Sequence, residues 1–228
     1  MATTSHATAQ LISETTVAAS IATPASTGGL ASKTPPPTPS VQIQMAPAAA
    51  AEDEALIMQL CDIVNLVYGE TEGDIFVEGY QRVRTDEMRQ IVRAGELAVA
   101  YLPLGESSST SQRWSVIGCM RLQTLAGSQT GEMGMFAIDP VHRGGGTGRE
   151  MAAFAEGHCR SVLGLTRMRL ELLVPLGFEH AFKKRLQAWY ERMGYVLVKL
   201  GVFQDDYPQL APLLKGPCEY RVFEKDLA

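Results

Sequence analysis

Residues 131–150 read GEMGMFAIDPVHRGGGTGRE, a pattern that predicts a strand, a sharp turn and a glycine-rich loop opening into a helix. The strand covers residues 132–138, and Asp139-Pro140 ends it because proline lacks a backbone donor and has a fixed φ. The helix is indicated by apolar side chains that share one face, Met151, Phe154, Ala155 and Cys159. Glycines at a helix start let backbone N–H groups approach a ligand, and the helix dipole favours an anion there. We therefore expect a phosphate or pyrophosphate on this loop, with a ligand-free turn as the alternative.

Two common phosphate-binding motifs do not fit the loop. A Walker loop needs a lysine followed by serine or threonine, whereas residues 148–150 are Gly-Arg-Glu. The dinucleotide fingerprint GxGxxG lacks its last glycine at the required spacing within residues 144–148. Arg143, Gly146 and Gly148 do match R-x-x-G-x-G directly after a strand. This pattern resembles the acetyl-CoA pyrophosphate loop of the GNAT superfamily of N-acetyltransferases.

A second signature extends the resemblance. Residues 186–195, LQAWYERMGY, resemble the family's helix that ends in WY-x-x-x-GY before a strand, and residues 168–174 between the two signatures read as a strand. The closing strand at residues 217–225, PCEYRVFEK, looks like that of fungal members. The resemblance implies an α/β fold of the GNAT type. Its mixed, mostly antiparallel central sheet would be flanked by helices and splayed at the acetyl-CoA site.

The same resemblance implies a cofactor site. Backbone N–H groups of the loop and the dipole of the following helix would bind the pyrophosphate, and the two arginines of the loop would add charge. Backbone groups of the preceding strand would pair with the pantetheine arm as if it were an added strand. The expected cofactor-binding residues are Phe136, Ala137, Ile138, Arg143, Gly144, Gly145, Gly146, Thr147, Gly148 and Arg149.

Glu132 is the leading candidate for the base that deprotonates the acceptor amine. It precedes Ile138 by six residues, where many family members carry a glutamate that acts directly or through water. Strand alternation places residue 132 on the same face as residues 134, 136 and 138. The alternative is a polar residue that only begins a strand, in which case Glu171 of the next strand is the reserve candidate.

Tyr190 matches the family's tyrosine whose hydroxyl lies near the CoA sulfur. A phenol with an ordinary pKa of about 10 is suited to protonating a departing thiolate. Packing between helix and sheet is expected more for Trp189 and Tyr195 than for Tyr190. The acids and histidines show no ligand spacing such as HExxH, so the sequence predicts no metal site.

The segment before this helix departs from the family pattern. Residues 176–185, LGFEHAFKKR, replace the usual asparagine-containing turn. The basic run Lys183, Lys184 and Arg185 has two interpretations, a solvated helix face or a contact with the CoA 3′-phosphate or the acceptor site. No acceptor-site residue can be carried over from the family here.

Composition divides the 228 residues into two parts. Residues 1–50 are rich in Ala, Thr, Ser and Pro with few large apolar side chains, so we expect a disordered tail. Residues 51–228 are expected to form the catalytic domain, where Cys61, Cys119, Cys159 and Cys218 are read as reduced, buried thiols. No stretch has the ~20 apolar residues that a membrane span needs. The tail has no arginine, so a cytoplasmic location is expected, with the nucleus as an alternative and a mitochondrial presequence less favoured.

The resemblance to the GNAT superfamily implies direct transfer of an acetyl group from acetyl-CoA, as cosubstrate, to a primary amine. The net charge of −5 disfavours nucleic acid as a partner and is compatible with a cationic acceptor. A small amine or amino acid is slightly favoured over a protein, and the resemblance adds a homodimer as an expectation. Two alternatives stay open, a non-catalytic acyl-CoA-binding module and an interaction protein that acts through its tail.

Overall fold

The computed structural model describes residues 40–104 and 113–227, so the disorder expected of residues 1–39 lies outside the described residues. The strands are β1 (Gln42–Met45), β2 (Leu97–Leu104), β3 (Arg113–Thr124), β4 (Thr130–Ile138), β5 (Arg167–Pro175), β6 (Val196–Val202) and β7 (Cys218–Asp226). The α-helices are α1 (Glu54–Glu72), α2 (Thr85–Arg93), α3 (Thr147–Ser161), α4 (Ala181–Arg192) and α5 (Phe203–Asp206). Short 3₁₀ turns are η1 (Ala48–Glu52), η2 (Pro140–His142) and η3 (Ala211–Leu213).

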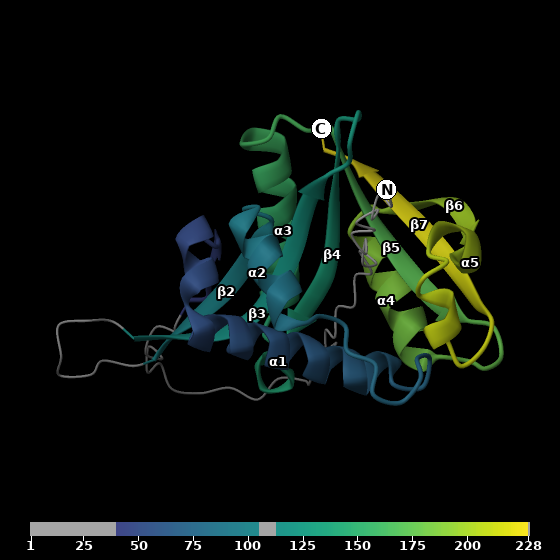
Figure 1. The fold of residues 1–228 in the computed structure, drawn as a ribbon. Coiled ribbons are helices and arrows are strands. Elements are labelled where there is room, and N and C mark those ends of the chain that lie inside the picture. The colour runs from purple at the N-terminus through teal and green to yellow at the C-terminus, as the bar shows by residue number, and fades with distance from the viewer. Residues whose placement is uncertain (1–39, 105–112, 228) are drawn as a thin grey trace, which may run out of the picture.

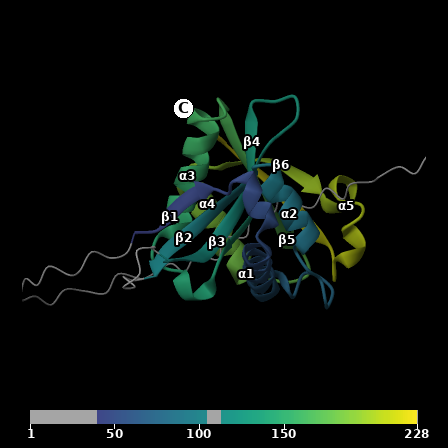
Figure 2. The ribbon, with the colours of Figure 1, turned by 60° about the vertical axis from the view of Figure 1, so that its left-hand side comes forward.

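The strands form one sheet in the order β1-β2-β3-β4-β5-β7-β6 (Figure 1). Neighbouring strands are antiparallel throughout except for β4 and β5, which are parallel. Helices cover both faces of the sheet: α1 and α2 lie on one face, α3 and α4 on the other (Figure 2). The mixed, mostly antiparallel sheet expected from the sequence is therefore confirmed.

β1 lies inside the segment that the sequence assigned to the tail. It pairs with β2 from Gln42↔Tyr101 to Met45↔Ala98, and the following residue, Ala46, is buried. An edge strand of four residues that contains two glutamines carries almost no hydrophobic signal against an Ala- and Thr-rich background. The boundary placed after residue 50 is therefore corrected, since the domain includes residues from Gln42 onward.

β4 contains a β-bulge near its middle. Its register with β3 shifts between Cys119 and Arg121, opposite Ala137 and Gly134. Within the bulge, Met135 has a φ of 46°, which makes it the one non-glycine residue with positive φ in the described part of the chain. An extra residue in one strand bends that strand and reverses the alternation of faces beyond it.

The bulge changes the face on which Glu132 lies. Met133, Phe136 and Ile138 pack in the cluster beneath α3 and α4, although simple alternation would separate residue 133 from residues 136 and 138. A Cβ atom on Gly131 would also point to this cluster, toward Cys159. Glu132, between Gly131 and Met133, therefore faces the α1 and α2 side. The expectation that it shares a face with residues 136 and 138 is wrong, because the bulge intervenes.

β4 and β5 separate soon after they meet. They are paired only at Thr130↔Arg167, Gly131↔Met168 and Glu132↔Arg169. Beyond Glu132, β4 continues beside β3 and β5 continues beside β7, and no pairing joins the two among the described residues. The strands diverge in a V, and α1 runs across its wide end to meet the start of α4 (Figure 1). We call this V the opening.

Candidate active site

The glycine loop at the wide end of the opening presents free backbone donors. Gly144 and Gly146 have φ values of 88° and 95°, which glycine adopts without strain, and Gly146 is the N-cap of α3. Within the described part of the chain, the N–H groups of residues 144–148 make no hydrogen bond to other groups. Residues 144–146 are exposed, and a Cβ on Gly145 or Gly146 would meet nothing within 4 Å. The loop therefore combines unpaired donors with the positive end of a helix dipole, an arrangement suited to an anion.

The two arginines of the loop differ in their surroundings. Arg149 is exposed in the first turn of α3. Arg143 turns back instead: its Nε donates to the Ile138 carbonyl at 3.1 Å and its Nη1 to Glu70 Oε2 of α1 at 3.3 Å. Burial lowers the pKa of Arg143, against the opposing effect of Glu70. Its Nη2 is buried without a hydrogen-bond partner among the described residues. Glu70 thus holds the positively charged Arg143 guanidinium away from the glycine loop, where the sequence predicted it would contact the pyrophosphate.

The strand leading to the loop has one free edge. Phe136, Ala137 and Ile138 are buried, and β3 pairs with this part of β4 on one side only. The opposite edge faces the opening, where β5 no longer pairs. The Ile138 carbonyl accepts the bond from Arg143, so a chain added along this edge would compete with that side chain. Pairing of pantetheine here stays a prediction.

Glu132 sits at the narrow end of the opening in a buried polar network. Gln123 Nε2 donates to its Oε1 at 2.8 Å, and Arg169 Nε lies 3.2 Å from its Oε2. Arg169 also pairs with Glu171, so one guanidinium serves two carboxylates. Burial, followed by the charge of Glu171, raises the pKa of Glu132 to about 8, although Arg169, Gln123 and Arg121 oppose the rise. A carboxyl with such a pKa can exchange a proton near neutral pH.

The network continues beyond the two carboxylates. Tyr207, just after α5, donates its hydroxyl to Glu171 Oε2 at 2.6 Å and lies 3.1 Å from the hydroxyl of Tyr220 on β7. The sequence had marked Glu171 only as a reserve candidate, and it had missed Arg169, Tyr207 and Tyr220. The spacing of Arg169 and Glu171, two apart on a strand, indicates a shared face. Nothing local in the sequence connects Tyr207 with that face.

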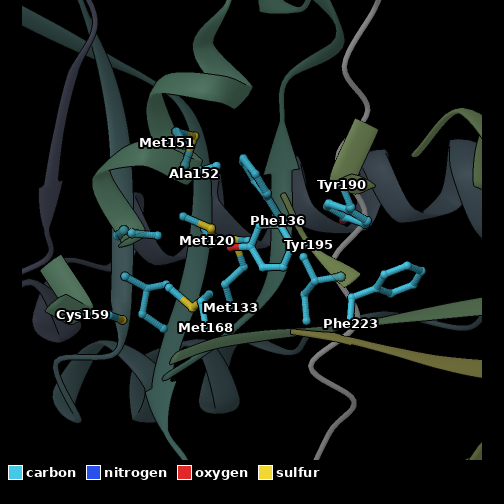
Figure 3. Close-up of a cluster of buried hydrophobic side chains, with 14 of the residues drawn as sticks. Met120, Met133, Phe136, Met151, Ala152, Cys159, Met168, Tyr190, Tyr195 and Phe223 are labelled. Carbon is cyan, nitrogen blue, oxygen red and sulfur yellow. The ribbon is translucent and has the colours of Figure 1, made fainter. Parts of the chain in front are cut away.

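Tyr190 lies on the other face of the sheet, in an aromatic cluster (Figure 3). Its ring centroid is 5.3 Å from that of Trp189 and 6.2 Å from those of Tyr195 and Phe223. Tyr190 is fully buried while Trp189 is half-buried, the reverse of the packing that the sequence indicated for these two residues. Trp189 in turn approaches Phe136 of β4, with centroids 6.4 Å apart. The rings thus connect α4 with β4 and β7.

The two predicted catalytic residues therefore lie on opposite faces of the sheet. Glu132 comes from the α1 and α2 side, and Tyr190 from the α3 and α4 side. A base and an acid arranged in this way can act on the two ends of a group held between them. Their roles stay predictions.

The basic run of α4 divides between two environments. Lys184 and Arg185 are exposed, as a solvated helix face requires, and Lys184 pairs with Glu179. Lys183 is instead fully buried and paired with the equally buried Glu72 at the end of α1. Beside this pair, His180 Nε2 lies 3.3 Å from Asp74 Oδ1. Lys183 is therefore a structural link between α1 and α4 rather than a surface cation.

The cysteines, the metal-ligating side chains and the helices also bear on the sequence-based expectations. All four cysteines are buried and none forms a disulfide within the described residues, so the expectation of burial is confirmed. The described residues contain no group of three or more His, Cys, Asp or Glu side chains that could hold a metal ion. None of the helices in the described ranges combines the length and apolar character of a membrane span.

Comparisons with known proteins agree with this fold. Residues 111–197 match the family model described as an acetyltransferase (GNAT) domain. A comparison with curated proteins found no match. Among solved structures, N-acetylglutamate synthase from Neisseria gonorrhoeae, complexed with coenzyme A and N-acetyl-glutamate, is 17% identical with a TM-score of 0.51. The match covers 82% of this chain but only 35% of that one.

Two further structures are similar over nearly their whole length. The PaiA N-acetyltransferase from Thermoplasma acidophilum, in complex with coenzyme A, has a TM-score of 0.55 at 12% identity, covering 82% of this chain and 99% of that chain. An N-acetyltransferase from Staphylococcus aureus Mu50 has a TM-score of 0.54 at 14% identity, covering 83% and 99%. The likeness of residues 217–225 to fungal members gains no support from these comparisons. The chain has the fold of the GNAT acetyltransferases, and its residues 111–197 match the domain of that family.

Proposed function

We propose that this chain is a GNAT N-acetyltransferase that moves an acetyl group directly from acetyl-CoA to a primary amine. The observation that carries the proposal is the free edge of β4, which leads from Glu132 straight into a loop of unpaired N–H groups. A pantetheine arm added along that edge would bring its pyrophosphate to the start of α3. The thioester would then lie in the opening, between the faces that carry Glu132 and Tyr190.

The proposed reaction needs one proton acceptor and one proton donor. Glu132 takes a proton from the acceptor ammonium, and the amine nitrogen then attacks the thioester carbonyl carbon. The C–S bond breaks, the acetyl group stays on nitrogen, and Tyr190 gives a proton to the leaving thiolate. The raised pKa of Glu132 supports its part, because a carboxyl that binds protons near neutral pH is a better base than an ordinary one.

We favour a small amine or amino acid as the acceptor. Glu132 and Glu171 share the single charge of Arg169, so with both carboxylates ionised the buried network carries one net negative charge. Such a site attracts an ammonium group. The solved structure from Neisseria gonorrhoeae contains N-acetyl-glutamate, an acetylated amino acid, which supports this choice of class. The expected homodimer and cytoplasmic location stay predictions.

Isothermal titration of acetyl-CoA into the full chain tests the proposal, with Gly146→Glu and Gly164→Glu as a matched pair. Both glycines have positive φ, are exposed and leave open space around a Cβ, but Gly164 lies beyond the other end of α3. We expect Gly146→Glu to abolish binding, because its carboxylate takes the place of the phosphate, and Gly164→Glu to retain it. The intact chain is then assayed for CoA release with a panel of amines. Absence of binding to the intact chain overturns the proposal, and binding without transfer to any amine leaves an acyl-CoA-binding module.

A further inference from the structure

We infer that Arg169 and Glu171 are positioning residues that hold the Glu132 carboxylate at the narrow end of the opening and control when it takes up a proton. The inference rests on the proposed function, in which Glu132 is the base. It gives a role to two residues that neither donate nor accept a proton in the proposed reaction.

The geometry places Arg169 between the two carboxylates. Glu132 and Arg169 are the last cross-strand pair before β4 and β5 separate, and Glu171 lies two residues further along β5 on the same face. Arg169 Nε faces Glu132 while its Nη2 pairs with Glu171. The side chains of Glu132 and Glu171 are 4% and 1% exposed, so water screens neither charge well.

Glu171 is the fixed member of the pair of carboxylates. Its backbone is paired within β5 and β7, opposite Val222, and Tyr207 donates to its second oxygen at 2.6 Å. Tyr220 adjoins the Tyr207 hydroxyl and extends the same chain of hydrogen bonds. Glu132 instead stands where the two strands part. Both carboxylates therefore adjoin the opening, Glu132 at its narrow end on β4 and Glu171 two residues further along β5.

Few other charges face Glu132. From β3 come Gln123, which is hydrogen-bonded to it, and Arg121, which pairs with Glu96. α1, packed against β4, presents apolar side chains, the buried thiol of Cys61, and Tyr68, whose ring Arg82 covers. Glu87 of α2 interacts with the charges of Arg82 and Arg121. Tyr207 and Tyr220 complete the set on the β7 side.

This arrangement gives Arg169 and Glu171 opposite effects on the same proton. The fixed negative charge of Glu171 favours the protonated form of Glu132, and the positive charge of Arg169 favours the ionised form. When Glu132 takes a proton from an acceptor, the net charge of the three groups changes from −1 to zero, because Arg169 and Glu171 then form a balanced pair. Proton uptake thus removes the repulsion between two buried carboxylates.

The test measures the protonation of Glu132 directly, without acetyl-CoA or an acceptor. The protein is labelled with glutamate carrying ¹³C in the side-chain carboxyl, and the Glu132 signal is identified by its loss in Glu132→Gln. We expect Glu171→Gln to lower the titration midpoint of Glu132 by at least about one pH unit and Arg169→Met to raise it by a similar amount. Opposite directions from two neighbouring substitutions are not expected from a general loss of packing.

A matched pair of controls comes from an exposed ion pair outside the network. Arg93 of α2 pairs with Glu52 at 2.8 Å, and both side chains are exposed. Arg93→Met and Glu52→Gln make the same charge changes and should leave the Glu132 midpoint in place. If Arg169→Met does not fold, it is replaced by Arg169→Lys, which keeps the positive charge. The titration midpoint measured in Glu171→Gln then decides the inference. An unmoved midpoint in Glu171→Gln overturns the inference, as do shifts of the same sign in both variants.

The experiment separates this inference from the proposed function. If the protein fails to transfer acetyl groups but shows the two opposite shifts of the Glu132 midpoint, the proposed function is wrong and the inferred charge network is supported. If the enzyme is active but neither substitution moves the Glu132 midpoint, the proposed function is supported and the positioning roles of Arg169 and Glu171 are wrong. In an active enzyme, the acid limb of kcat/KM should move with the same sign as the NMR midpoint.

Discussion

Glu132 of β4 and Arg169 of β5 form the last cross-strand pair before these strands diverge, and their side chains are joined by an ion pair of 3.2 Å. The pair closes the narrow end of the opening on the face covered by α1 and α2. A charged pair at this point places a buried carboxylate beside a free strand edge. In the proposed reaction, that carboxylate receives the proton of the acceptor.

Glu132→Gln should remove most of the activity and change its pH dependence. In the wild-type enzyme the base must be ionised, so kcat/KM should rise with pH through the pKa of Glu132, about 8. The variant should lose about 100-fold or more in kcat, together with this limb of the profile. The pH profile is measured with two acceptors whose amines differ in pKa. The limb that reports Glu132 stays at the same pH with both acceptors, whereas a limb that reports the acceptor amine moves. An unchanged profile in Glu132→Gln would assign the base to another group.

Tyr190→Phe should lower kcat by at least about 100-fold while acetyl-CoA still binds. The substitution keeps the buried ring among Trp189, Tyr195 and Phe223 and removes only the hydroxyl that would protonate the thiolate. Tyr195→Phe is the control. It loses the Tyr195 hydrogen bond to Glu156, at a cost of about 1 kcal/mol in stability, and should keep kcat. Equal kcat values for wild type and Tyr190→Phe, from stopped-assay CoA release, would exclude Tyr190 as the acid.

Lys183→Met should lower the free energy of unfolding by about 3 kcal/mol, because it removes the cation that pairs with the buried Glu72 carboxyl. The double variant Glu72→Leu with Lys183→Met should recover much of that loss, since it leaves no unpaired charge. Lys184→Met is the matched control, because the exposed Lys184–Glu179 pair should change stability by less than about 0.5 kcal/mol. Urea denaturation measures all three. Equal effects of Lys183→Met and Lys184→Met would contradict a buried link between α1 and α4.

Glu70→Gln should tighten acetyl-CoA binding. Glu70 holds the Arg143 guanidinium away from the glycine loop, and an ion pair of this partly exposed kind is worth up to about 1 kcal/mol. Releasing Arg143 should therefore lower the Kd by up to about fivefold, measured by titration calorimetry. Glu52→Gln removes an equal charge from the exposed pair with Arg93 and should leave the Kd unchanged. Weaker binding in Glu70→Gln would mean that Arg143 acts from its present position.

Several elements were predictable because their signals are local. The strand at residues 168–174 and the strand–loop–helix around Arg143 depend on neighbours a few positions apart, through periodicity, glycine and proline. The four-residue strand β1 was not predictable in this way. Its pairing with β2 joins residues far apart in the chain, and its own side chains contribute little hydrophobic pattern.

The bulge and the charge network depend on tertiary structure for different reasons. The face of Glu132 depends on an irregularity at Met135, and a strict period of two cannot anticipate an extra residue. Lys183 reads as part of a surface basic run, and only the approach of α1 shows that it is buried against Glu72.

The sequence by itself determined the glycine loop, because turn chemistry and hydrophobic period are properties of adjacent residues, and the resemblance of its two signatures to the GNAT superfamily implied the fold class. Only the tertiary structure decided that Arg169 stands between Glu132 and Glu171, that Glu70 holds Arg143, and that Tyr190 lies on the face of the sheet opposite Glu132. These contacts join segments from different strands and helices. Their charges and burial therefore arise only once the sheet has formed.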